Sequence, residues 1–194
     1  MVVVGARRAE GEVVEVRVDP RDGGQVALPG PLDEAPVAED VAPVAEMRRR
    51  GICVSLGADG AACNNRLDMF DEMRLAATLQ AVKEVPGALT ARDVLWMATR
   101  EGARTLGLEQ EIGSIETGKR ADLILVERDR AHLSPDVDAW TTLVYAARGT
   151  DIRMTMVDGR LLVRDFELTG MDEVAVAAEG RTAAAELANR AGLA

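Results

Sequence analysis

The stretch ICVSLGADG, residues 52–60, decides the expected fold because it has the pattern of a buried strand that ends in a carboxylate. Residues 52–56 are apolar or β-branched apart from one serine, which is typical of a strand covered on both faces. An acid is not stable inside such a strand without a partner, so we expect Asp59 where the strand opens into a loop. In parallel α/β folds, the chemistry takes place at that edge of the sheet.

Spacing alone favours a simpler interpretation, in which Asp59-Gly60 is only a turn. Asp-Gly is among the commonest turn dipeptides, and the chain uses it again at Asp158-Gly159. The choice between a turn and a functional carboxylate therefore depends on the residues around this stretch.

Helix signals flank the strand on both sides. Before it, Pro43 suits a first helical turn, and the cations of residues 48–50 lie near the negative pole of a short helix. After it, Asn65 can cap a helix that begins at Arg66 and carries Phe70, Met73 and Ala77 at helical spacing. Strand and helix units in this order are typical of a parallel α/β fold, in which a crossover helix covers each buried strand.

Four longer motifs carry a resemblance to a known family. They are VAPVAEM at residues 41–47, LGADG at 56–60, NNRLDMF at 64–70 with EMR at 72–74, and GSIETGKRADLI at 113–124. Together they resemble the C-terminal part of the metal-dependent amidohydrolases. The most similar branch is that of the deaminases of methylthioadenosine and S-adenosylhomocysteine, with the related chlorohydrolases. Weaker similarity in residues 143–149 and 157–159 extends the match to about residue 185.

The resemblance implies an α/β fold, namely the C-terminal portion of a (β/α)8 barrel with part of a small β-sandwich domain. It implies that Asp59, at the end of the last barrel strand, ligates a divalent metal, zinc or iron, and shuttles a proton from the bound water. For Asn64 and Asn65, helix capping is one interpretation and substrate contact the other. The remaining implied ligands are histidines, whereas the single histidine of this chain, His132, lies in a segment outside the implied metal site.

A single carboxylate does not hold zinc or iron, because such a cation needs three or more protein ligands. A complete barrel needs roughly 250 residues, more than the 194 present. We therefore expect a chain related to hydrolases of non-peptide carbon–nitrogen bonds that deaminate purine nucleoside-like or other heteroaromatic substrates. We expect it to be inactive alone, through truncation, a frame shift or a divergent start. The alternatives are a non-catalytic module that assembles with another polypeptide, and a fragment without function.

The chain divides into four expected regions. Residues 1–40 form a divergent or linker-like start with one alternating run, residues 12–18, that fits a strand. Residues 41–110 hold the barrel units, including a helix that opens with the capping box of residues 90–93 and stops at Gly107. Residues 111–170 hold sandwich strands at 121–126, 153–157 and 160–164 and a short helix at 138–147. Residues 171–194 form a C-terminal helix, and we expect both of these helices to pack against the core.

Composition limits the partners. The net charge of −10 argues against nucleic acid or an anionic membrane surface as a binding partner. A small-molecule substrate is expected, with a homo-oligomer as an open alternative. Two cysteines without a signal peptide indicate a reducing, cytoplasmic setting, with Cys53 in the core and Cys63 either structural or lining the pocket. Lys119 and Arg120 lack a P-loop pattern and are expected in a solvated turn.

Overall fold

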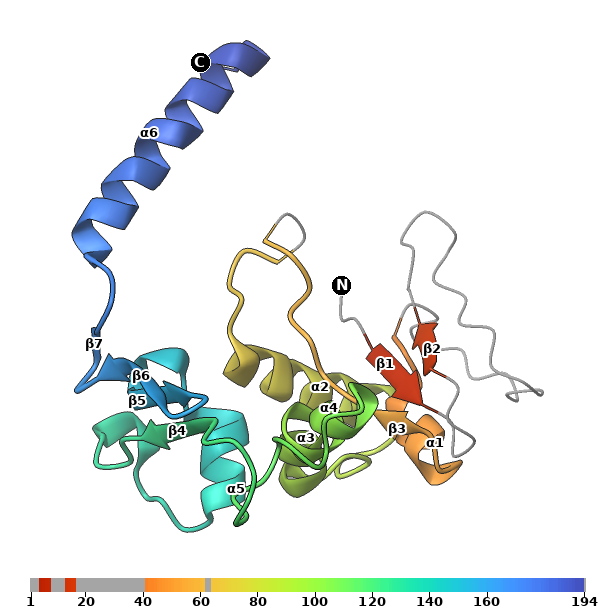
Figure 1. Ribbon diagram of the computed structural model, residues 1–194. Helices are drawn as coiled ribbons and strands as arrows, with labels where there is room; N and C mark the ends of the chain where they lie inside the picture. Colours follow the sequence, from red (N-terminus) through yellow and green to blue (C-terminus); the bar gives the residue numbers. More distant parts are fainter. Residues whose placement is uncertain (1–3, 8–12, 17–40, 62–63, 194) are drawn as a thin grey trace.

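The computed structural model describes residues 4–7, 13–16, 41–61 and 64–193, and it shows a mixed α/β protein. Figure 1 shows helices in the middle of the molecule, with one sheet on each side of them. The first sheet has the order β2-β1-β3, from β1 (Val4–Arg7), β2 (Val13–Val16) and β3 (Cys53–Val54). The second has the order β4-β5-β6-β7, from β4 (Leu123–Val126), β5 (Ile152–Val157), β6 (Arg160–Arg164) and β7 (Glu167–Leu168).

The strand pairing differs from the parallel arrangement that the sequence predicted. Every pair between the described strands is antiparallel, including the contact of β3 with β1 that sets Val54 opposite Ala6. β3 is also shorter than residues 52–56, although both of its residues are buried as expected. β2 confirms a strand within residues 12–18. The barrel and the sandwich themselves stay predictions.

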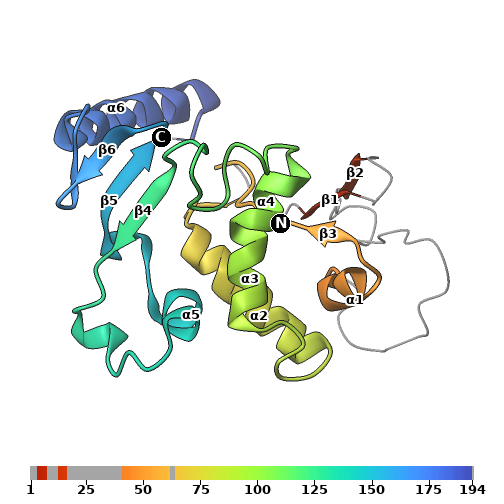
Figure 2. The same cartoon turned by 60° about the horizontal axis from the view of Figure 1, so that its bottom comes forward.

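Four helices form the centre of the fold, namely α1 (Val44–Arg49), α2 (Met69–Lys83), α3 (Ala91–Ala98) and α4 (Arg100–Thr105). Figure 2 shows α2, α3 and α4 between the two sheets, with α1 beside β3. The core between them is apolar and includes Met47, Val54, Phe70, Met73, Val94 and Met97. One buried polar group, Gln80 of α2, is satisfied because its amide accepts from Ala45 N at 3.0 Å and donates to Ala42 O at 2.8 Å. These two bonds fix α2 against the start of α1.

The start of α2 corrects the sequence-based prediction of a helix that begins at Arg66 under an Asn65 cap. The helix begins at Met69, and its N-cap is Asp68, whose carboxylate accepts a hydrogen bond from Phe70 N at 2.9 Å. Leu67 has a φ of +43°, which is incompatible with a right-handed helix at that position. The other oxygen of Asp68 accepts from Gly149 N at 3.1 Å, so tertiary contact selects Asp68 as the cap.

The capping box at the start of α3 is confirmed, since the Thr90 hydroxyl accepts from Asp93 N and the Asp93 carboxylate accepts from Thr90 N. The predicted single helix is instead divided into α3 and α4 at Thr99, which has non-helical dihedral angles. The Thr99 hydroxyl donates to Leu95 O at 2.7 Å, a side-chain bond that often bends a helix.

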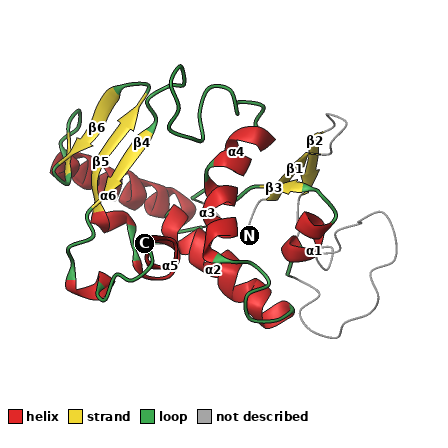
Figure 3. Ribbon diagram, turned by 90° about the horizontal axis from the view of Figure 1, so that it is seen from below, coloured by secondary structure: helices red, strands yellow, loops and turns green. Residues whose placement is uncertain are grey.

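The C-terminal half confirms several local predictions. β5 and β6 form the expected hairpin around Asp158-Gly159, with Val157 opposite Arg160, and Figure 3 shows them as neighbouring strands. Between β4 and β5, the chain passes through η1 (Ala131–Leu133), α5 (Ala139–Thr141), the π-helix η2 (Thr142–Ala146) and η3 (Gly149–Asp151). Val144 is fully buried, as expected of a packing element.

The last helix, α6 (Glu173–Ala191), forms where predicted but does not pack against the core. Asp172 caps it by accepting from Val174 N and Ala175 N, yet none of its residues is buried. Figure 1 shows it standing away from the rest of the molecule. The expectation that it is a packing element is therefore wrong for the described structure, because no described segment covers its apolar residues. Among the described helices, none is both long and apolar enough to cross a membrane.

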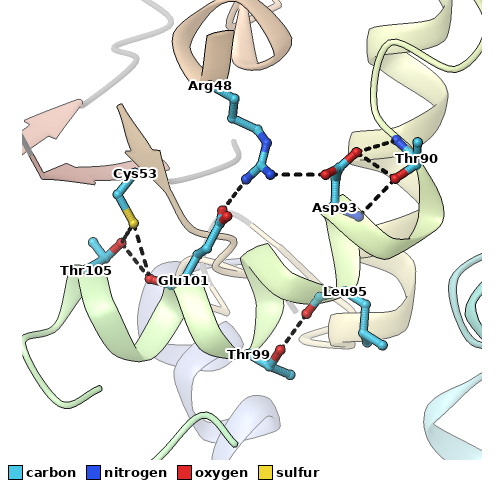
Figure 4. A network of polar contacts seen from close by, with 8 residues as sticks. All are labelled: Arg48, Cys53, Thr90, Asp93, Leu95, Thr99, Glu101 and Thr105. Carbon is cyan, nitrogen blue, oxygen red and sulfur yellow. Dashed lines mark hydrogen bonds and ion pairs between the residues drawn. The ribbon is translucent and has the colours of Figure 1, made fainter. Parts of the chain in front are cut away.

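Arg48 of α1 joins three helices through charged contacts, as Figure 4 shows. Its guanidinium contacts Glu101 of α4, and it lies 3.2 Å from Asp93 of α3. Burial raises the pKa of Asp93, but hydrogen bonds from Thr90 and the charge of Arg48 outweigh it, so this pKa lies below its ordinary value. Only 18% of the Arg48 side chain is exposed, so water screens these ion pairs weakly.

We predict that Arg48→Ala lowers the free energy of unfolding by about 1–3 kcal/mol, because two shielded carboxylates lose their shared cation. Arg49→Ala is the matched control on the same helix. Arg49 is 55% exposed and its ion pairs with Glu46 and Glu84 face solvent, so we expect a much smaller loss. Urea denaturation measures both, and equal losses would contradict the role assigned to Arg48.

The segment between α4 and β4 packs tightly at Gly113. Its φ is +87°, and a Cβ at this residue would lie 2.6 Å from Ala103 Cβ. Gly118, on the same segment, has a similar φ of +93° but open space around it. The two glycines therefore separate the cost of backbone conformation from the cost of a steric clash.

We predict that Gly118→Ala lowers the free energy of unfolding by about 1–2 kcal/mol through the left-handed φ. Gly113→Ala should cost about 1–3 kcal/mol more, because the added methyl must displace the neighbouring helix. Thermal unfolding followed by circular dichroism measures the difference, and an equal effect of the two substitutions would show that residue 113 has room for a side chain.

Candidate functional site

Asp59 lies in the loop that follows β3, as the sequence predicted, and its backbone is left-handed with a φ of +58°. Aspartate tolerates this conformation better than most residues. The side-chain oxygen Oδ2 is shielded from solvent, and it accepts no hydrogen bond from the described residues. A carboxylate that serves only a turn normally uses its oxygens on nearby backbone N–H groups. Asp59 therefore has an acceptor for which the described chain supplies no donor.

An unpartnered, shielded carboxylate oxygen fits a cation ligand, because a bound divalent ion replaces the missing hydrogen bond. Asp59 alone does not make a metal centre. Within residues 41–61 and 64–193 and the first two strands, no three side chains of His, Cys, Asp or Glu are grouped so that they could hold a metal ion. The described residues thus supply one fitting ligand.

His132 has a different partner. Its Nε2 lies 2.9 Å from Oδ2 of Asp151, a side chain that is 3% exposed and that also accepts from Arg148 N at 2.9 Å. These contacts connect η1 with η3, so the position of His132 is set by a buried carboxylate rather than by Asp59.

The two asparagines that follow Asp59 differ from one another. Asn64 donates from Nδ2 to the carboxylate of Glu72, which is 5% exposed, and its Oδ1 accepts from Arg66 N at 3.0 Å. Asn65 is exposed, and no described residue forms a hydrogen bond with its side chain. Neither residue caps α2. Asn64 instead anchors the loop to that helix, while Asn65 remains available for contact with another molecule.

The two cysteines are also distinguished. Cys53 is buried in β3, and its Sγ lies 3.6 Å from Thr105 Oγ1, which confirms its place in the core. Cys63 lies outside the described residues.

Sequence reasoning missed a cavity of about 510 Å³ beside α3 and α4. Lys119 lines it and is only 13% exposed, which corrects the expected solvated position of this residue, whereas Arg120 is 54% exposed as expected. Its ammonium donates to Glu109 O at 2.6 Å and to Ser114 Oγ at 2.7 Å. The recurrence of Trp96, Arg100 and Arg104 at every fourth residue was the available signal, since residues four apart share one helix face.

Comparison with known proteins gives the family. The model described as "Amidohydrolase family" matches residues 13–162, most of the chain. The chain belongs to the amidohydrolase family. This match begins within the segment that we expected to be divergent, and it confirms the resemblance drawn from residues 41–124.

Two relatives illustrate the similarity. A 5'-deoxyadenosine deaminase of Methanosarcina mazei is 44% identical over 171 residues, which cover 88% of this chain and 39% of that protein. A 5-methylthioadenosine/S-adenosylhomocysteine deaminase of Halobacterium salinarum is 44% identical over 172 residues, with the same coverage of 88% and 39%. The chain therefore spans about two fifths of the length of these relatives.

Two solved structures are similar in fold. An adenosine deaminase from Xanthomonas campestris with bound zinc has a TM-score of 0.72 and 37% identity, covering 75% of this chain and 34% of its own. The atrazine chlorohydrolase of Arthrobacter aurescens complexed with zinc has a TM-score of 0.67 and 28% identity, covering 73% of this chain and 32% of its own.

We predict that Asn64→Ala lowers the free energy of unfolding by about 1–2 kcal/mol, because the buried carboxylate of Glu72 loses a donor. Asn65→Ala is the matched control, and we expect it to change stability by less than about 0.5 kcal/mol. Urea denaturation with a fluorescence readout distinguishes the two. A loss for Asn65→Ala as large as for Asn64→Ala would contradict the assignment of the anchoring role to Asn64 alone.

Proposed function

We propose that this chain carries the metal-ligating and proton-transferring carboxylate, Asp59, of an aminohydrolase that deaminates adenosine-like or related heteroaromatic substrates. The observation that carries the proposal is the shielded, unpartnered Oδ2 of Asp59 in the loop after β3. Membership of the amidohydrolase family and the names of the deaminases that the chain resembles support the reaction class. The zinc in two similar structures supports zinc as the cation.

Asp59 would perform two tasks in this reaction. A divalent cation, when bound, lowers the pKa of a water ligand and so makes hydroxide available near neutral pH. One oxygen of Asp59 would bind the cation, while the other accepts the proton that the attacking water loses. The new bond from the water oxygen to the ring carbon replaces the bond from that carbon to its exocyclic amino nitrogen. Asp59 would return the first proton to the departing amino group, and the second water proton passes to the neighbouring ring nitrogen. Ammonia and the ring carbonyl are then the products.

We further propose that the chain by itself neither holds the cation nor turns over substrate. Asp59 is one ligand, and three or more are required to retain zinc at cellular concentrations. The prediction is that the purified chain incubated with zinc retains far less than one metal per chain and releases no ammonia from methylthioadenosine. Metal analysis after desalting and an ammonia assay measure this. Stoichiometric zinc with turnover would refute the inactivity.

A chimera tests the role of Asp59 itself. The matching segment of the Methanosarcina mazei relative is replaced by the corresponding residues of this chain, and ammonia release from 5'-deoxyadenosine is measured. We predict an active chimera in which Asp59→Asn lowers kcat/KM by about 10²- to 10⁴-fold, the range for loss of a positioned acid or base. Asp158→Asn is the matched control. Asp158 also precedes a glycine, but it lies in an exposed hairpin turn, so we expect this substitution to leave activity unchanged.

A second candidate function is that of a non-catalytic module that assembles with another polypeptide. The favouring observation is β4, an edge strand in the described sheet, where Ile124 is 55% and Leu125 is 49% exposed. Apolar edge strands are templates for pairing with another chain. Light scattering after size exclusion would then give a complex of defined stoichiometry, and Ile124→Lys would abolish it.

A further inference from the structure

The cavity beside α3 and α4 is lined by groups that the proposed deamination does not use. It has a volume of about 510 Å³, and Asp59 is not among its lining residues. Trp96, Arg100 and Arg104 come from the two helices, and Glu109, Ile112 and Lys119 come from the segment that follows. Cavities of about 300–1,000 Å³ are the size that holds a drug-sized ligand.

Half of the charged side chains around the cavity have an ion-pair partner. Glu101 contacts Arg48, and Glu116 lies 3.4 Å from the ammonium of Lys119. The pKa of Glu116 is lowered by a hydrogen bond from Ser114 and then by the charges of Lys119 and Arg100, so Glu116 is ionised and balanced. These groups hold the walls together and have little capacity left for a ligand.

Three groups are left without such a partner in the described part of the chain. Arg104 makes no hydrogen bond or ion pair there. Arg100 makes none either: it lies 5.6 Å from the centroid of the Trp96 ring, and its charge acts on Glu116 from a distance. Glu109 lines the cavity, and its Oε2 is shielded and accepts no hydrogen bond. The soft terminal torsion of a glutamate lets either oxygen turn toward a donor. The cavity thus offers two cations without a hydrogen-bonded partner among the described residues, one unsatisfied acceptor and an aromatic ring.

We propose that this cavity is a binding site for a nucleoside monophosphate, distinct from the site of Asp59. Guanidinium groups one helical turn apart match the oxygens of a phosphate. The indole of Trp96, over which Arg92 also lies at 4.3 Å from the ring centroid, supplies the remaining aromatic surface for a base. Glu109 accepts from an N–H group of that base. The proposal concerns binding only, so it does not rest on the proposed deamination and can fail independently of it.

Tryptophan fluorescence provides a local test, because the chain has two tryptophans, Trp96 and Trp140. In a Trp140→Phe background, Trp96 is the single reporter. Adenosine monophosphate, adenosine and inorganic phosphate are titrated separately, without metal. We expect a saturable change with adenosine monophosphate and affinities at least about tenfold weaker for adenosine and for phosphate, because each lacks one half of the interactions. Calorimetric titration of the unmodified chain repeats the comparison without a fluorescent reporter.

Two substitutions test the assigned groups. Arg104→Gln and Glu109→Gln should each weaken binding of adenosine monophosphate at least about tenfold, the effect of losing one charged hydrogen bond. Arg181→Gln and Glu179→Gln on α6 are charge-matched controls on an exposed helix, and we expect no change. Thermal unfolding verifies that each variant is folded. The proposal is overturned by a lack of saturable binding, by phosphate binding as tightly as the nucleotide, or by an Arg104→Gln affinity equal to the control.

Discussion

A carboxylate oxygen that is shielded from water and has no donor is energetically unfavourable, and among the described residues Asp59 holds such an oxygen in the loop after β3. A turn residue would use that oxygen on its own backbone, whereas a metal ligand leaves it free for a cation. The strand and the loop thus place this oxygen at the residue for which the family resemblance implies a metal ligand. This oxygen alone is insufficient to retain a cation, because zinc is held by three or more protein ligands.

The position of Asp59 depends on how firmly β3 is held by the helices. Ile52 N donates to Met47 O of α1 at 3.0 Å, and Leu56 N donates to Met97 O of α3 at 3.3 Å. Between these two bonds, Cys53 packs against Thr105 of α4. Arg48 then connects the same three helices on their polar side. The loop that carries Asp59 therefore begins from a strand that is fixed at both ends.

Elements with strong local signals were predictable from the sequence. The capping box at Thr90 and the hairpin at Asp158-Gly159 depend on neighbouring residues, and both formed as expected. The unpartnered oxygen of Asp59, the cap at Asp68 and the burial of Lys119 were not predictable. The cap depends on a bond from Gly149 N, which is distant in the sequence. The other two depend on how a loop folds back on itself or beside its neighbours, which no short motif encodes. The exposure of α6 was missed for the same reason, because an amphipathic pattern does not reveal whether a partner surface is present.

Anomalous X-ray diffraction from crystals of the chimera grown with zinc tests the role of Asp59 most directly. The expected result is one zinc ion with an Asp59 oxygen at about 2.0–2.2 Å, the usual distance for a carboxylate ligand. A fully liganded zinc ion whose coordination shell excludes Asp59 would contradict it.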